Sequence, residues 1–157
     1  MEKPINETTP SYQVAEIQLI YKTNVKPSLR PRIKTSKDAY EILRSVWDES
    51  KLEFIEQFKA MFLNRANEVL GIMEVSTGGV SGTVADPKII FAAALKANAS
   101  GLIVAHNHPS GNLIPSQSDI DLTRKLKAGG RFLEISLMDH VIVTTEGYYS
   151  FADEGMM

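Results

Sequence analysis

The spacing of apolar and polar residues changes several times along the chain, and each spacing predicts a different element. Apolar and polar positions alternate in Val14–Tyr21 (VAEIQLIY), which predicts a strand. A proline-broken connection follows at Lys26–Arg32. Apolar residues then recur at helical spacing within Ala39–Trp47, and Ser36 or Thr35 is available to cap that helix.

The middle of the chain predicts a pair of strands. Phe58–Asn64 and Glu68–Ser76 have the composition of strands, and Arg65–Asn67 is the expected turn between them. Glycine then becomes frequent, which is typical of irregular backbone. A loop or bulge is therefore expected at Gly78, Gly79 and Gly82.

In the second half of the chain, helices and strands are expected to alternate. Asp86 followed by Pro87 favours a helix start, and the nearly all-apolar Gly101–His108 (GLIVAHNH) is typical of a strand buried on both faces. Another helix is expected at Ser116–Ala128, ended by Gly129–Gly130. Strands are predicted in LEISLMD, HVIVTT and YYSFA. This order of elements predicts an α/β sandwich with a mixed sheet.

Composition narrows the class of protein. A chain of 157 residues with 43% hydrophobic and 23% charged residues suits one globular domain. The net charge of −2 does not favour broad binding to nucleic acid, and no apolar run reaches the roughly 18 residues of a membrane span. The polar N-terminus lacks the apolar stretch of a secretory signal, so we expect a cytoplasmic protein. Without cysteine, any metal must be held by nitrogen and oxygen.

Two of the three histidines stand one residue apart at the end of a predicted strand. Residues two apart in a strand point to the same face, so His106 and His108 can converge on one ion while Asn107 points away. Zinc in a catalytic site takes three protein ligands and keeps one position for water. Asp119 is the nearest candidate for the third ligand, and Asp121 lies about 200° further round the helix.

A structural interpretation competes with the metal site. Ser116 and Asp119 also form the pattern of a capping box, and S-x-x-D alone is more often a helix start than a metal site. The combination favours a metal: H-x-H at a strand end, a turn, and an acid on the first turn of the next helix. Iron, cobalt or manganese would suit the same ligands as zinc.

These residues resemble a known family. His106-x-His108-Pro109, followed by Ser116 and Asp119, is similar to the motif of the JAMM (MPN-type) zinc metalloproteases. HNHPSG, LMDHVIV and YYSFADEG more narrowly resemble the bacterial RadC proteins. The resemblance implies a cytidine-deaminase-like three-layer α/β sandwich at residues 35–157, with Zn²⁺ held by His106, His108 and Asp119. Residues 1–34 are expected to form an extension with one strand, and they do not match the helix-hairpin-helix region usual in RadC proteins.

A hydrolase of this kind needs a carboxylate to accept the proton of water. Glu56 and Glu74 compete for that role, and we favour Glu56 because E-x-F-x-x-x-x-LN matches the RadC pattern. Ser116 is expected to hydrogen-bond the developing oxyanion, as the resemblance implies. His140 is expected to be a structural histidine or one that supports a ligand.

Three functions follow as hypotheses. The first is zinc-dependent hydrolysis of an amide bond in a protein or peptide substrate, either a peptide or an isopeptide bond. The second, an accessory role in DNA repair without hydrolysis, depends on the label of RadC proteins, and only the basic stretch KPSLRPRIK offers phosphate contacts. The third is a structural or partner-binding module in which a metal only stabilises the loop after His108. The substrate and the oligomeric state are left open.

Overall fold

The computed structural model describes residues 12–78 and 83–157. Its strands form one five-stranded sheet in the order β2-β1-β3-β4-β5. The β3–β4 pair is parallel and the other three pairs are antiparallel, so the sheet is mixed, as predicted. The strands are β1 (Gln57–Leu63), β2 (Val69–Thr77), β3 (Gly101–Asn107), β4 (Ser136–Val143) and β5 (Tyr148–Ser150).

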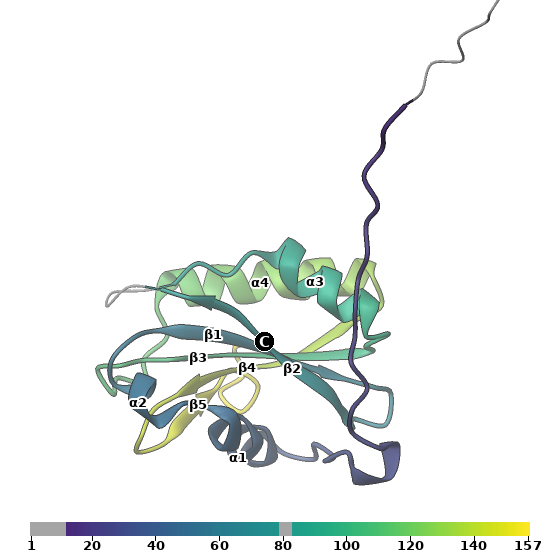
Figure 1. Cartoon of the computed structure of the whole chain (residues 1–157). Helices are drawn as coiled ribbons and strands as arrows, with labels where there is room; N and C mark the ends of the chain where they lie inside the picture. Colours follow the sequence, from purple (N-terminus) through teal and green to yellow (C-terminus); the bar gives the residue numbers. More distant parts are fainter. Residues whose placement is uncertain (1–11, 79–82) are drawn as a thin grey trace, which may run out of the picture.

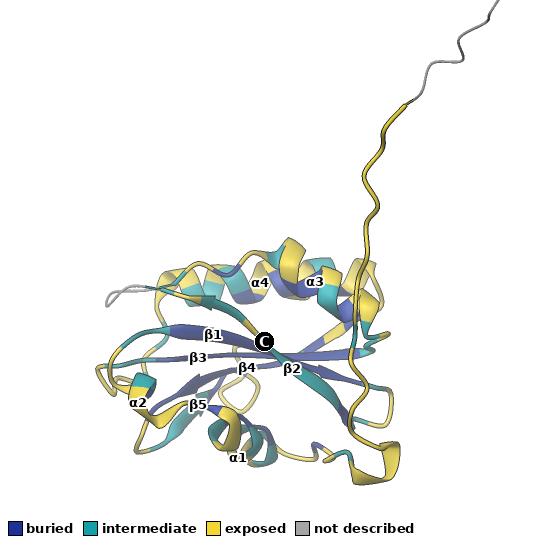
Figure 2. Ribbon diagram, viewed as in Figure 1, coloured by how far each residue is buried: buried dark blue, intermediate teal, exposed yellow. Residues whose placement is uncertain are grey.

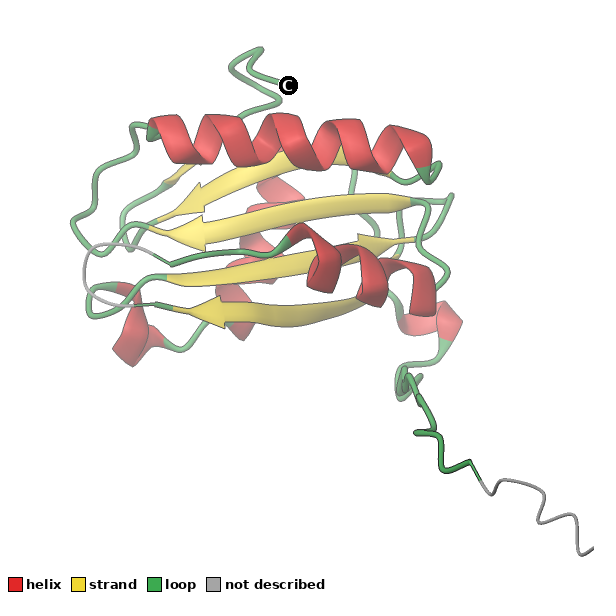
Figure 3. Ribbon diagram, turned by 90° about the horizontal axis from the view of Figure 1, so that it is seen from above, coloured by secondary structure: helices red, strands yellow, loops and turns green. Residues whose placement is uncertain are grey.

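Helices cover both faces of the sheet. α3 (Pro87–Lys96) and α4 (Gln117–Phe132) lie on one face, and α1 (Ser36–Val46) lies on the other (Figures 1 and 3). A 3₁₀ turn (Pro27–Leu29) and the short helix α2 (Glu49–Leu52) complete the elements. The three layers confirm the predicted α/β sandwich.

The alternating side chains of the central strands divide the core into two clusters. In β1, Ala60 and Phe62 pack under α3 and α4, whereas Met61 and Leu63 pack against α1 and its neighbours. β1 and β3 are buried along their whole length (Figure 2). Both faces of β3 are covered, which confirms the prediction that its apolar run is a strand buried on both sides.

The helix starts follow the capping residues in the sequence. Thr35 caps α1, since its Oγ1 accepts from the Asp38 amide at 3.2 Å. Asp86 caps α3, with Pro87 at the first helical position. Both starts confirm the sequence prediction. Among the described residues, no helix has the length and apolar character needed to cross a bilayer.

The strand expected at Val14–Tyr21 is absent. These residues are extended but unpaired, and the side chains of Val14 and Ile17 are 89% and 87% exposed. The segment leaves the body of the protein (Figure 1), and its last residue, Tyr21, donates a hydrogen bond from its hydroxyl to the Leu70 carbonyl at 2.5 Å. Alternation gives a segment a strand-like face, but a strand also needs a neighbour for its backbone groups.

Two other boundaries differ from the prediction. α4 continues through Gly129–Gly130 to Phe132, and Gly130 is required there for close packing rather than for a helix end. A Cβ at Gly130 would overlap the carbonyl of Ile135. The predicted strands LEISLMD and HVIVTT are one continuous strand, β4. The polar pair Asp139-His140 suggested a break, but both side chains are buried and hydrogen-bonded. Of the predicted glycine loop, Gly79 and Gly82 lie outside the described residues.

Candidate metal centre

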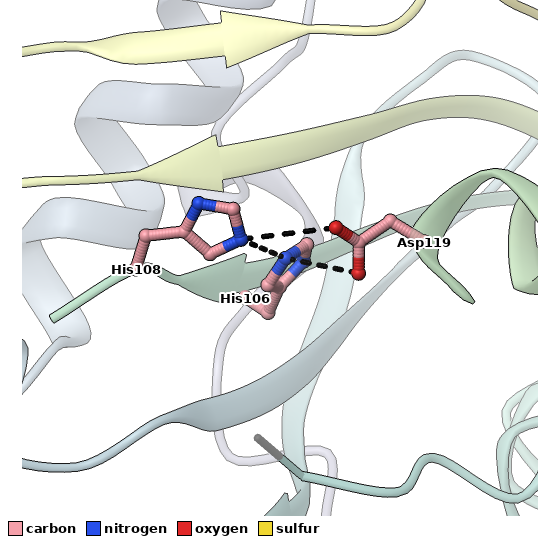
Figure 4. Close-up of side chains that lie close together, drawn as sticks. All are labelled: His106, His108 and Asp119. Carbon is pink, nitrogen blue, oxygen red and sulfur yellow. Dashed lines mark hydrogen bonds and ion pairs between the residues drawn. The ribbon is translucent and has the colours of Figure 1, made fainter. Parts of the chain in front are cut away.

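His106, His108 and Asp119 converge at the end of β3 (Figure 4). His106 projects from β3 toward α4, His108 follows the strand end, and Asp119 lies in the first turn of α4. The Nε2 atoms of the two histidines are 2.9 Å apart. Asp119 Oδ1 is 3.3 Å from His106 Nε2, and Asp119 Oδ2 is 3.7 Å from His108 Nε2.

The spacing of these atoms fits a tetrahedral ion. Zinc bonds of about 2.1 Å to nitrogen and oxygen give a tetrahedron with edges of about 3.4 Å. The observed separations of 2.9, 3.3 and 3.7 Å bracket that value. His106 is almost completely buried, while the side chains of His108 and Asp119 are 15% and 14% exposed. Three side chains thus offer a partly enclosed set of nitrogen and oxygen donors that could hold a metal ion.

The hydrogen bond of His108 away from the site fixes which of its nitrogens faces the other ligands. Its Nδ1 lies 2.6 Å from the carbonyl oxygen of Asn112, and a carbonyl can only accept. Nδ1 therefore donates, which leaves the Nε2 lone pair for a metal. The neighbouring Asp119 raises the pKa of His108 through a hydrogen bond, against the effect of burial.

Asp119 is both a helix cap and a member of the candidate centre. Ser116 Oγ accepts from the Asp119 amide at 3.1 Å, and the Ser116 amide donates to Asp119 Oδ2 at 2.7 Å. The capping box and the metal site, which the sequence posed as alternatives, are therefore compatible. Burial alone would raise the pKa of Asp119, but the neighbouring imidazoles of His106 and His108 favour its ionised form and hold that pKa well below its usual range. The carboxylate is thus ionised and oriented before any ion binds.

A cavity of about 390 Å³ opens beside the three ligands. Glu56 and Ser116 line it together with His108 and Asp119. Glu56 stands just before β1, and its Oε1 accepts from the Thr83 amide at 3.3 Å. A mostly polar lining completes the cavity, comprising Thr83, Pro109, Ser110, Asn112, Ile114 and Ser118.

The competing carboxylate, Glu74, lines a different cavity. It hydrogen-bonds Thr77 Oγ1 at 2.5 Å, which lowers the pKa of its carboxyl group, and Lys59 Nζ at 3.4 Å. Lys59 lies on the same face of β1 as Met61. The α4 helix covers the opposite face, which carries Ala60. The structure thus places Glu56 in one cavity with His108 and Asp119, and Glu74 in another.

His140, which the sequence predicted to be a structural histidine or one that supports a ligand, lies directly behind His106. Its Nε2 is 2.8 Å from His106 Nδ1, and its Nδ1 is 2.7 Å from Thr123 Oγ1. The imidazole is completely buried and stacks on Phe151 at 4.6 Å between ring centres. Burial lowers the pKa of His140 well below its usual range.

Asn107 was not identified by the sequence analysis beyond its pointing away from the histidines. Its fully buried side chain accepts from the Gln57 amide at 2.7 Å and donates to the carbonyls of Leu52 and Ile55 at 2.8 and 2.9 Å. These bonds hold the backbone on both sides of Glu56. A polar residue at the end of an otherwise apolar buried strand was the signal available in the sequence.

Comparison with known proteins identifies the family of this chain. The RadC-like JAB domain family matches residues 33–156. A UPF0758 protein of Flavobacterium johnsoniae is 39% identical over 155 residues, which are 98% of this chain and 66% of that protein. A UPF0758 protein of Desulfitobacterium hafniense is 37% identical over 131 residues, 83% of this chain and 56% of that protein. One of Chlorobium chlorochromatii is 33% identical over 156 residues, 99% and 68% of the two chains.

The chain therefore spans between 56% and 68% of the length of these three relatives. The family match covers the sheet, its helices and every residue of the candidate centre. This agrees with the resemblance in the HNHPSG and LMDHVIV motifs. The chain belongs to the RadC-like JAB domain family.

Proposed function

We propose that this domain is a zinc-dependent hydrolase that cleaves an amide bond, either a peptide or an isopeptide bond, in a protein substrate. The observation that carries the proposal is the convergence of His106, His108 and Asp119 beside a cavity that Glu56 also lines. His106, His108 and Asp119 would hold the ion. A zinc ion bound there would polarise the scissile carbonyl and lower the pKa of a coordinated water from 15.7 to about 7.

Glu56 and Ser116 supply the remaining chemistry in this proposal. Glu56 accepts a proton from the attacking water as the C–O bond forms, and returns it to the nitrogen of the leaving amine as the C–N bond then breaks. Ser116 Oγ already accepts from the Asp119 amide and lies 2.9 Å from Ser118 Oγ. When Ser118 donates in that pair, the hydrogen of Ser116 is available to donate to the oxyanion that develops on the carbonyl. Both residues would therefore act on the reacting atoms from the same cavity.

The ligand assignment is tested by zinc content in matched variants. Asp121 is an exposed acid two residues after Asp119, hydrogen-bonded to Gln117 on the outer surface of α4. Purified wild-type protein and Asp121→Ala should each hold about one zinc per chain, whereas Asp119→Ala should lose it. Circular dichroism would verify that both variants are folded. Unchanged zinc content in folded Asp119→Ala would remove Asp119 from the proposed site.

The catalytic assignment needs a separate variant. Glu56→Gln keeps the size of the side chain but cannot accept a proton, so hydrolysis should fall about 10²–10⁴-fold while zinc content stays unchanged. Hydrolysis would be followed on a panel of peptides and isopeptide-linked peptides. Zinc-loaded wild-type protein that cleaves no member of the panel would favour the accessory role in DNA repair, which stays a prediction.

A further inference from the structure

Three buried side chains form a continuous chain of hydrogen bonds behind the candidate centre. His106 Nδ1 is 2.8 Å from His140 Nε2, His140 Nδ1 is 2.7 Å from Thr123 Oγ1, and Thr123 Oγ1 donates to the Asp119 carbonyl at 2.7 Å. His106, His140 and Thr123 are each at most 2% exposed. The chain therefore begins at one candidate ligand and ends on the backbone of another.

The number of hydrogens on each group determines which atom donates in each of these hydrogen bonds. A threonine hydroxyl has one hydrogen, and that of Thr123 is donated to the Asp119 carbonyl. Thr123 Oγ1 must therefore accept the hydrogen bond that it shares with His140, so His140 carries a hydrogen on Nδ1. The direction is set by the carbonyl, which can only accept.

The same counting extends to His106. The ring of His140 is completely buried between Phe58 and Phe151, where an uncharged imidazole is favoured. An uncharged ring with its hydrogen on Nδ1 has a lone pair on Nε2. His106 Nδ1 must then donate to that lone pair, and in an uncharged His106 this leaves Nε2, which faces His108 and Asp119, without a hydrogen.

We infer that Thr123 and His140 are positioning residues that fix the tautomer of His106 and so keep its Nε2 lone pair available to a metal ion. This inference rests on the proposed metal site for its purpose. Without the Thr123 hydroxyl, the hydrogen of His140 can move to Nε2, and the hydrogen of His106 then moves to the nitrogen that faces the site. Metal binding would have to reverse both shifts.

The tautomers can be read directly in metal-free protein. Because the chain has three histidines, long-range ¹H–¹⁵N correlation spectra of the imidazole rings contain three patterns to assign. In wild-type protein His106 and His140 should both carry the hydrogen on Nδ1, and in Thr123→Val both should shift toward Nε2. A wild-type spectrum with the hydrogen of either ring on Nε2 overturns the inference, even if the variant does not fold.

Zinc affinity, measured by competition with a chromophoric chelator, gives a second readout. Thr123→Val should weaken zinc binding about 10–100-fold, as loss of a partner behind a ligand usually does, and Thr123→Ser should restore it. Thr144→Val is the matched control, because Thr144 Oγ1 is a buried hydroxyl that bonds within the turn before β5. It should leave zinc affinity unchanged.

The outcomes separate this inference from the proposed function. Equal zinc affinity in wild type and folded Thr123→Val would overturn the role of Thr123, whether or not the protein is a hydrolase. Wild-type protein with the expected tautomers that binds no zinc would refute the metal site and leave the tautomer assignment in place. Equal weakening in Thr123→Val and Thr144→Val would reduce the effect to general stability and also overturn the inference.

Discussion

Replacing Asn107 by alanine would remove three buried hydrogen bonds at the point where β3 supports the start of β1. A hydrogen bond of this kind contributes about 1 kcal/mol net, so the variant should lose roughly 3 kcal/mol of unfolding free energy. The side chain is completely buried, and water cannot easily replace the lost partners. The total unfolding free energy of a typical domain, about 5–15 kcal/mol, exceeds this loss, so the variant should still fold.

Equilibrium unfolding in urea, with a chelator present to remove metal effects, measures this loss. Asn64→Ala is a suitable control, because the Asn64 side chain also makes three hydrogen bonds, to Ala66 and Glu68 in the turn after β1. That turn is partly exposed, so solvent can compensate and the loss should be smaller. If Asn107→Ala lost less than about 1 kcal/mol of unfolding free energy, the three buried hydrogen bonds of Asn107 would not be stabilising the start of β1 as argued.

Two further results are expected. At the proposed site zinc must displace a proton from His108, whose pKa is raised by Asp119. Zinc affinity should therefore fall by about tenfold for each pH unit below that raised pKa. Competition titrations from pH 5.5 to 8 that show a constant zinc affinity would contradict this expectation. Gly130→Ala, whose Cβ would overlap a backbone carbonyl, should cost about 1–3 kcal/mol in urea unfolding. Gly147→Ala, which has open space, should stay within about 0.5 kcal/mol of wild type, and equal losses in the two variants would argue against close packing at α4.

The sequence predicted the elements whose causes are local. Caps such as Thr35 and Asp86 act within one helical turn, and the apolar run of β3 follows from burial on both faces. The strand expected at Val14–Tyr21 failed because its formation depends on a neighbour, which no spacing rule supplies. Gly129–Gly130 was interpreted as a helix end because the contact with Ile135 is invisible in the sequence.

The site shows the same division. The separation of His106 and His108 places both on one side of a strand, a local property that the sequence contains. The choice between Glu56 and Glu74 depends on which cavity each residue lines, and this is decided by how β1 and β2 pair within the sheet. Pattern matching favoured Glu56, but it did not explain the position of this residue. The hydrogen bonds of Asn107 to the backbone on both sides of Glu56 became visible only in the tertiary structure.

The parallel pairing of β3 and β4 has a consequence for how such a centre can diversify. A single crossover, from Gly101 through α4 to Val143, contributes all three candidate ligands and both side chains of the hydrogen-bond chain behind them. Glu56 lies outside this unit, just before β1, the strand next to β3. The candidate ligands and the proposed proton acceptor thus come from separate stretches of sequence, so a substitution at Glu56 need not disturb the three ligands.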